Sequence, residues 1–175
     1  MPNQGNPPDN DFSTLWTDCG LCCDGTMFGS VEVTADEAER LATHGFEFQT
    51  DEAGDRYFRQ RCCALKGSVC GVYADRPQRC REYACRVLRA LEDSTIAMPE
   101  ARRRVEAVLS YRRDLLRATG ADSLPQAFRV VEGARKKRDG VEAAFALFGM
   151  EKALDDWFRI NKHKRMAPER RGDSG

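Results

Sequence analysis

The feature that most constrains this chain is the placement of its cysteines. All eight lie between Cys19 and Cys85, and the rest of the 175-residue chain contains none. Apolar packing alone would not use so many thiols in so short a stretch. Adjacent cysteines occur twice, as Cys22-Cys23 and as Cys62-Cys63, and such neighbours bridge one another only with strain. The stretch therefore predicts thiol chemistry, either metal binding or disulfides with separate partners.

The choice between metal and disulfide depends on the cell compartment. The N-terminus has neither the basic nor the apolar region of a secretory signal, so we expect a cytoplasmic location. Clustered thiols in the cytoplasm bind metals more often than they form disulfides. Four thiolates suit a zinc ion, an iron ion or an iron–sulfur cluster. We therefore predict zinc or iron as the cofactor, and an iron–sulfur cluster is one form that it could take.

Charge and composition limit the kinds of binding partner that we expect for this chain. The 28 basic and 28 acidic residues cancel, so no global field favours nucleic acid. No apolar run approaches the roughly 18 residues that a membrane span needs. Residues 1–85 hold 8 basic and 14 acidic residues, whereas residues 86–175 hold 20 and 14. We expect a metal ion as the main partner and no membrane, and a protein partner could dock on the basic helical segment.

Local signals in the cysteine-rich part predict short strands and one helix. Alternating residues at 30–34, 45–50 and 56–61 predict strands, and the last two would form a hairpin. Thr34 and Glu37 have capping-box spacing at the start of a helix over 36–44, which Gly45 would end. Turn residues at 66–68 lead to a strand over 69–73. Asp75 would cap a single helix from Pro77 to about residue 93.

The second part of the chain is helical in pattern. Residues 99–119 place valines and leucines on one stripe, and Gly120 would end the helix. A shorter helix is expected at 124–131. A third, at 141–160, would use its aromatic residues for the apolar face: Phe145, Phe148, Trp157 and Phe158, together with Leu154.

These signals predict an α+β fold, with a small irregular metal-stabilised cysteine-cluster module of short strands packed against a C-terminal helical segment. The expected parts are a disordered lead-in at 1–12, the metal-binding module at 13–95, the helical segment at 96–161 and a flexible basic tail at 162–175. Without metal, we expect the module to fold poorly, because a structural zinc contributes on the order of 10–16 kcal/mol in small metallo-domains.

Cysteine spacing suggests which thiols share an ion. Cys19-x2-Cys22 is a spacing at which two thiolates meet one ion, whereas Cys80 and Cys85 lie about 140° apart around a helix. That pair shares an ion only if the helix is distorted. Eight thiols could form two four-thiolate sites or one multinuclear cluster, and the first cysteine group must then meet the second in space. The candidate ligands are Cys19, Cys22, Cys23, Cys62, Cys63, Cys70, Cys80 and Cys85.

The order of the cysteines resembles a known family. The pattern runs from Cys19-Gly20-Leu21-Cys22-Cys23 through Cys62-x-x-Leu65 to Cys70-x2-Tyr73-x2-Arg76-Pro77-x2-Cys80-Arg81-x-Tyr83-x-Cys85. It is similar to the YkgJ-like cysteine-cluster family, described as a "putative zinc- or iron-chelating domain" with a CxxCxxCC signature. The resemblance covers about residues 15–90 and implies that the chain chelates zinc or iron through clustered thiolates.

Two departures from the family pattern concern the ligand set. The family often has a cysteine where this chain has Trp16, and this chain has Cys63 beside the expected Cys62. We expect Cys63 to replace the missing ligand, and the alternative is a bystander. Arg76 or Arg81 either compensates the thiolate charge or stays in solvent. Asp18 and Asp24 are interpreted as turn residues rather than as oxygen ligands.

The sequence leaves enzyme activity open. One branch of the family is similar to flagellin lysine N-methylases, so an iron-centre or iron–sulfur enzyme related to protein lysine N-methylases is one alternative. An interaction module with a purely structural zinc is another. The chain has no phosphate-binding loop, no dinucleotide-binding motif and no H-E-x-x-H motif. Neither His44 nor His163 has the neighbouring residues that a catalytic histidine needs, so we propose no Cys–His nucleophile.

Overall fold

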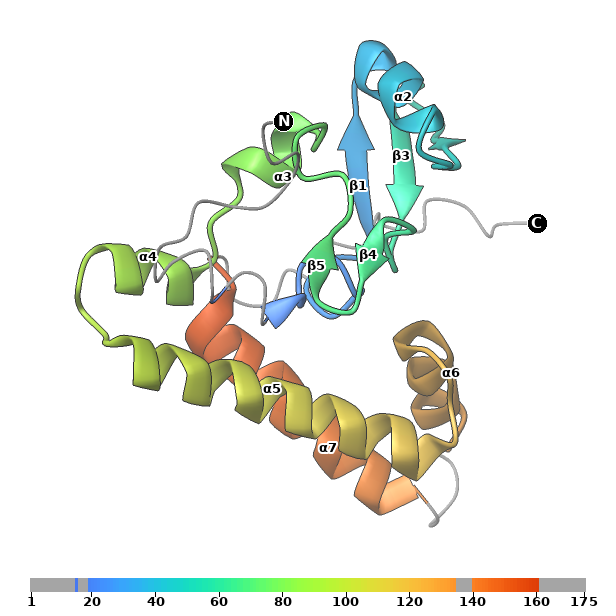
Figure 1. Ribbon diagram of the computed structural model, residues 1–175. Helices are drawn as coiled ribbons and strands as arrows, with labels where there is room; N and C mark the ends of the chain where they lie inside the picture. The colour runs from blue at the N-terminus through green and yellow to red at the C-terminus, as the bar shows by residue number, and fades with distance from the viewer. Residues whose placement is uncertain (1–14, 16–18, 135–139, 161–175) are drawn as a thin grey trace. The chain divides into compact units, whose positions relative to one another are not determined.

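The computed structural model describes residues 15, 19–134 and 140–160 (Figure 1). The expected lead-in at 1–12 and the expected tail at 162–175 lie outside the described residues, as do Trp16, Asp18 and His163. The described residues divide into two compact units, the first ending at Ala84 and the second beginning at Cys85. Short strands and helices together give the α+β class that the sequence predicts.

The first unit contains two small antiparallel sheets. In the larger one, β3 (Arg56–Arg59) lies between β1 (Ser30–Val33) and β2 (Gln49–Thr50). The register places Val31 opposite Phe58 and Gln49 opposite Tyr57. This confirms the predicted hairpin and the predicted first strand, each with shorter strands than the alternation suggests.

The smaller sheet pairs β4 (Leu65–Lys66) with β5 (Val69–Cys70). The predicted turn at 66–68 joins these strands, and Gly67 adopts a positive φ of 63° there. The predicted strand over 69–73 is thus limited to its first two residues. Each strand of this hairpin has only two residues, so contacts outside the hairpin must hold it in place.

Aromatic rings fill the core beside the larger sheet. The Phe46 and Phe58 rings meet edge to face at 4.9 Å between centroids, and Phe46 stacks on Phe48 at 6.4 Å. Leu41 of α2 (Ala35–Ala42) is fully buried in the same cluster, which extends to Cys62. The core of this unit therefore reaches the cysteines directly.

The start of α2 is fixed by the predicted capping box. The Thr34 side chain accepts a hydrogen bond from the Glu37 amide at 3.3 Å, and the Glu37 carboxylate accepts one from the Thr34 amide at 2.9 Å. The other Glu37 oxygen accepts from the Gln78 amide at 2.7 Å. Glu37 therefore ties α2 to the first turn of α3 (Gln78–Glu82), which contains Cys80.

The predicted cap at Asp75 is wrong. Pro77 holds the N-cap position of α3, and the Asp75 carboxylate instead pairs with His44 Nε2 at 2.9 Å. A carboxylate from another helix, Glu37, reaches the Gln78 amide. Sequence spacing could not find this partner because it lies 41 residues away.

The predicted single helix from Pro77 to about residue 93 is also wrong. It divides into α3 and α4 (Arg86–Glu92), because Tyr83 takes an extended conformation with ψ of 120°. The Tyr83 ring packs edge to face on Phe28 at 4.7 Å. A continuous helix would carry this ring elsewhere, so the contact favours the break.

The second unit consists of helices. After α4 come α5 (Met98–Thr119), α6 (Leu124–Ala134), α7 (Val141–Ala153) and a π-helical turn, η2 (Leu154–Phe158). The structure confirms the predicted end of α5, where Gly120 adopts a positive φ of 63°. α5 and α7 pack side by side and run antiparallel (Figure 1). α7 places mostly small residues on its buried side: Ala143, Ala146, Met150 and Ala153.

The predicted apolar face of the last helix is partly wrong. Leu154 and Phe158 are buried, but Phe145 and Phe148 are 72% and 67% exposed. The reason is the close approach of the two helices. A Cβ at Gly149 would lie 2.5 Å from the Tyr111 ring, so only small residues fit on the α5 side of α7 at this point.

A first prediction concerns Glu37, which is 8% exposed. Glu37→Ala leaves the Thr34 and Gln78 amides without their acceptor, and we expect a loss of about 1–3 kcal/mol in the free energy of unfolding. Urea unfolding measures this value. The matched control is Glu39→Ala, an exposed position on the same helix, which should change stability by less than about 0.5 kcal/mol. Equal effects of the two variants would contradict the anchoring role of Glu37.

Candidate metal centre

The loop that contains Cys23 is a tight turn. Gly20 has a positive φ of 64°, and its carbonyl accepts hydrogen bonds from the Cys23 and Asp24 amides at 2.9 and 3.0 Å. A Cβ at Gly20 would lie 3.3 Å from the Ser68 Cα, so this loop lies directly against the β4–β5 turn. The Asp24 carboxylate accepts from the Thr26 amide at 2.8 Å, which is the turn role expected for it.

Cys62 is joined to this loop through its backbone. The Cys62 amide donates to the Cys23 carbonyl at 2.8 Å, and the Cys62 carbonyl accepts from Leu65 at 3.1 Å. The Cys62 side chain is buried, whereas the neighbouring Cys63 is exposed. The Ala64 and Leu65 amides donate hydrogen bonds to the Cys62 sulfur, which stabilise its thiolate.

Cys70 is positioned by the small hairpin. It lies opposite Leu65 in the β4–β5 pair and is half-buried. The following Gly71 amide donates to the Ala64 carbonyl at 2.8 Å. A Cβ at Gly71 would lie 2.9 Å from that carbonyl oxygen, so the position accepts no side chain without movement. Cys23 and Cys70 both pack against the core cluster that includes Cys62.

Cys80 lies in the short helix α3. Its amide bonds to the Pro77 carbonyl at 2.9 Å, and the side chain is half-buried. Arg81 donates to the Arg76 and Ala74 carbonyls at 2.7 and 2.9 Å, which fixes the loop before the helix.

The four thiols of Cys23, Cys62, Cys70 and Cys80 act on one another electrostatically, and we call them the thiol quartet. Burial, with smaller contributions from the other three thiols, raises the pKa of Cys23 to about 12. Burial likewise raises the pKa of Cys80 to about 12, with added contributions from Cys62 and Cys70. Burial, with smaller contributions from the neighbouring Cys63 and from Cys70, raises the pKa of Cys62 to about 11. Each of the four thiols therefore lies within electrostatic reach of the other three.

Arg76 supplies positive charge near the quartet. It lowers the pKa of Cys80, against the larger effect of burial. Its guanidinium lies over the Tyr73 ring at 3.6 Å from the centroid, and its Nε donates to the Tyr73 carbonyl at 3.1 Å. Of the two arginines considered from the sequence, Arg76 acts on a thiol, and Arg81 holds backbone carbonyls.

The other four cysteines have different surroundings. Cys19 and Cys22 are half-buried at the start of the first unit, and Cys63 is exposed. Cys85 is the N-cap residue of α4 in the second unit. Burial raises the pKa of Cys85, and the Leu88 and Val87 amides oppose this shift. None of the eight cysteines, all of which lie in the described ranges, is assigned to a disulfide. The two sequence groups do come together, since Cys23 meets Cys62, Cys70 and Cys80.

Two contacts that position the cysteines were not predicted from the sequence. Thr34-x-x-Glu37 located the capping box, but nothing in the sequence pairs Glu37 with Gln78. The cysteine pattern includes Gly71, but the pattern alone assigns no role to this glycine. In the structure, the close approach of Gly71 to the Ala64 carbonyl fixes the chain directly after Cys70. A glycine next to a cysteine in a hairpin is a signal for such close approach.

The first unit is an α+β fold in which several short segments place thiols at or near the core. This arrangement is typical of small domains that bind a metal through thiolates. Residues 16–101 match a family model, CxxCxxCC, described as "Putative zinc- or iron-chelating domain". This stretch of the chain includes all eight cysteines and is similar to the CxxCxxCC family. No curated protein and no solved structure was found to match the chain. None of the helices in the described ranges is long and apolar enough to cross a membrane.

The donor set fits the metals in that description. Thiolates are soft ligands that favour zinc and iron, and a cation would offset the mutual repulsion of the quartet. Amide donors to a ligating sulfur, as at Cys62, are the usual surroundings of a metal-bound thiolate. Within the part of the chain that the structure describes, no three His, Cys, Asp or Glu side chains stand in an arrangement that could hold an ion. Metal binding by the quartet therefore requires the thiols to turn toward a common point.

A second prediction concerns Gly71. Gly71→Ala forces the added Cβ against the Ala64 carbonyl, and we expect a cost of about 1–3 kcal/mol in stability together with weaker metal binding. Thermal unfolding and competition with a chelator measure the two effects. The control is Gly133→Ala, where nothing lies within 4 Å of the new Cβ in helix α6. This variant should be neutral or stabilising, and an equal loss in both variants would refute the close-approach argument.

Proposed function

We propose that the thiol quartet of Cys23, Cys62, Cys70 and Cys80 binds one zinc or iron ion and that this protein is a metal-chelating protein. The observation that carries the proposal is that Cys23, Cys62 and Cys70, from three separate segments, lie in or against one core cluster, and that Cys80 of α3 lies within electrostatic reach of all three. The match to a zinc- or iron-chelating family supports it. The ion would link the Cys23 loop, the segment between β3 and β4, the β4–β5 hairpin and α3.

Four thiolates around one ion leave no open coordination position, which is typical of a structural or storage site rather than a catalytic one. When bound, the ion supplies positive charge at the centre of the quartet. The chain itself supplies the sulfur atoms, the amide donors to Cys62 and the charge of Arg76 near Cys80. Cys19 and Cys22 have a ligand spacing of their own and remain candidates for further ligands of a larger cluster.

Cys63 is the weakest ligand candidate in this proposal. Its side chain is exposed, whereas that of Cys62 is buried. Cys63 lies in the turn that the Cys62 carbonyl and the Leu65 amide close at 3.1 Å, and it is not part of the core cluster that includes Cys62. The proposal therefore assigns Cys62 to the quartet and leaves Cys63 outside it.

A third prediction follows from this assignment. Each of Cys23→Ser, Cys62→Ser, Cys70→Ser and Cys80→Ser should lower metal affinity at least about tenfold, as the loss of a ligand does. Cys63→Ser is the matched control and should keep the full metal-to-protein ratio. Elemental analysis of protein purified anaerobically under reducing conditions measures this ratio. Full metal content in the quartet variants would refute the assignment, and loss of metal in Cys63→Ser would restore Cys63 as a ligand.

The same preparation identifies the metal. Zinc gives a colourless protein, whereas thiolate-bound iron or an iron–sulfur cluster absorbs visible light. Exchange for Co²⁺ gives sulfur-to-metal charge-transfer bands whose intensity reports how many thiolates bind. A single Co²⁺ with four thiolates supports the quartet. More than one ion per chain supports a larger cluster that includes Cys19 and Cys22.

A fourth prediction concerns removal of the metal. A strong chelator should destabilise the first unit, and amide hydrogen exchange should accelerate there, from the Cys23 loop through α3. Helices α5 and α7 should keep their protection, because their core contains no cysteine. Uniform loss of protection in both units, or no loss in the first, would contradict a metal that stabilises the first unit alone.

A further inference from the structure

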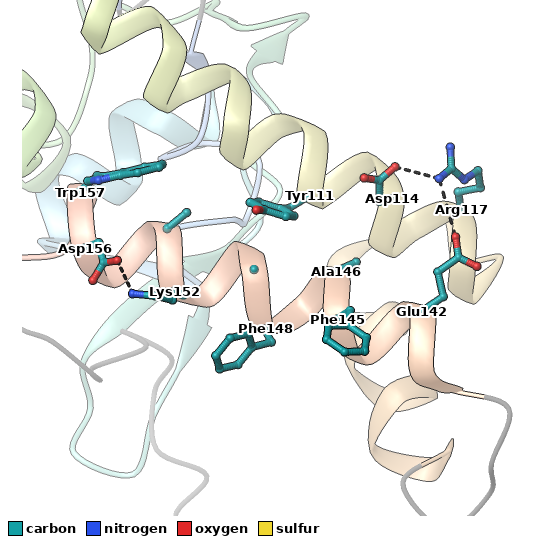
Figure 2. A pocket seen from close by; sticks show the side chains of 12 residues that line it. Tyr111, Asp114, Arg117, Glu142, Phe145, Ala146, Phe148, Lys152, Asp156 and Trp157 are labelled. Carbon is teal, nitrogen blue, oxygen red and sulfur yellow. Dashed lines mark hydrogen bonds and ion pairs between the residues drawn. The ribbon is translucent and has the colours of Figure 1, made fainter.

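The second unit exposes a row of large apolar side chains. Val141, Phe145 and Phe148 on α7 are 57%, 72% and 67% exposed, and we call these three residues the α7 stripe. Their spacing of four and three residues places them on one face of the helix. In Figure 2 the two phenylalanine rings project from α7 on the side opposite α5. Two phenylalanines this exposed on one helix face indicate an interaction surface rather than scattered surface residues.

The surface beside the stripe is hollowed. A groove of about 530 Å³ runs along α5 and α7, and both phenylalanines line it. Tyr111 of α5 and Trp157 of η2 lie along the same groove (Figure 2). Since Phe145 and Phe148 belong both to the stripe and to the groove lining, a helix laid on the stripe would contact part of the groove.

The charges at the two ends of the stripe have opposite signs. Glu142 lies beside Val141 at one end, and Lys152 follows Phe148 by one helical turn at the other. Both are exposed. Their ion pairs within the chain, with Arg117 at 3.8 Å and with Asp156 at 2.6 Å, lie in solvent, so they are weak and easily exchanged.

This arrangement is complementary to itself. If a second α7 is laid antiparallel, with a two-fold axis between Phe145 and Phe148, each Phe145 meets Phe148 of the second copy. The same axis brings each Lys152 to the Val141–Glu142 end of the second copy. Aromatic rings then cover one another at the centre, and opposite charges meet at both ends. Such matching of a surface to itself is what a two-fold interface requires.

We infer that the α7 stripe is the interface of a homodimer, in which two α7 helices pack antiparallel. Four phenylalanine rings of about 150 Å² each bring roughly 600 Å² into the interface. This is about half of the roughly 1,200 Å² that a stable specific dimer buries, and Val141 and the charged ends add to it. The interface is small, and we expect a dissociation constant on the order of micromolar. All of these residues lie in the second unit, so the inference does not depend on the proposed metal site.

The test is sedimentation of the full-length protein over a range of micromolar concentrations. The wild type should pass from monomer to dimer as concentration rises. The double variant Phe145→Ser, Phe148→Ser should remain a monomer at every concentration. The control is Val130→Ser, which changes an exposed apolar residue of α6 that is 40% exposed and lies outside the stripe. It should dimerise as the wild type does.

Exchange of the terminal charges tests the antiparallel register. Glu142→Lys alone and Lys152→Glu alone each place like charges together at both ends of the dimer, and each should weaken dimerisation about tenfold. The variant with both changes restores opposite charges and should return to within about threefold of the wild type. Failure of the double exchange to recover affinity would overturn the antiparallel arrangement.

Two further outcomes would overturn the dimer itself. One is a wild type that is monomeric throughout the concentration range, with or without protection of α7 from hydrogen exchange. Protection in such a monomer would mean that the chain itself covers the stripe. The other is dimerisation that the serine variants leave unchanged. Metal content and far-ultraviolet circular dichroism of each variant should match the wild type, which separates a lost interface from a lost fold.

Discussion

The main constraint on the first unit is that four partly buried thiols lie within electrostatic reach of one another. Burial raises the pKa of Cys23, Cys62 and Cys80, and neighbouring thiols add to each shift. Ionising the quartet without a cation would place negative charges side by side in a region of low dielectric. A protein core gains nothing from such an arrangement, since apolar residues would pack as well. A soft cation bound by the quartet, as proposed, would offset this repulsion.

Features set by neighbouring residues could be predicted from the sequence. The Thr34–Glu37 capping box, the turn at Gly67 and the end of α5 at Gly120 each depend on a few consecutive residues, and the structure confirms all three. The meeting of the two cysteine groups followed from counting ligands, because neither group alone supplies two four-thiolate sites. Which thiols meet could not be predicted, since that depends on how the Cys23 loop lies against the β4–β5 turn.

The wrong predictions share one physical cause, which is a tertiary contact that outweighs a local preference. Asp75 is a good local cap, but Glu37 arrives from another helix and His44 takes the Asp75 carboxylate. Residues 77–93 have helical character throughout, but the contact of Tyr83 with Phe28 favours a break. In α7, hydrophobicity alone favoured the phenylalanines for the core. Close packing against Tyr111 instead selects glycine and alanine there, and the phenylalanines are left exposed.

In the first unit, positioning the thiols and keeping the short strands folded depend on interactions of different strength. Three hydrogen bonds place the segments that contain the quartet: Cys62 to Cys23, Gly71 to Ala64 and Gln78 to Glu37. Each contributes about 0.5–1.5 kcal/mol net, or up to about 3 kcal/mol where the acceptor is charged. A structural ion in a small domain contributes about 10–16 kcal/mol. The hydrogen bonds therefore determine where the thiols lie, and a bound ion would determine whether strands of two to four residues remain folded.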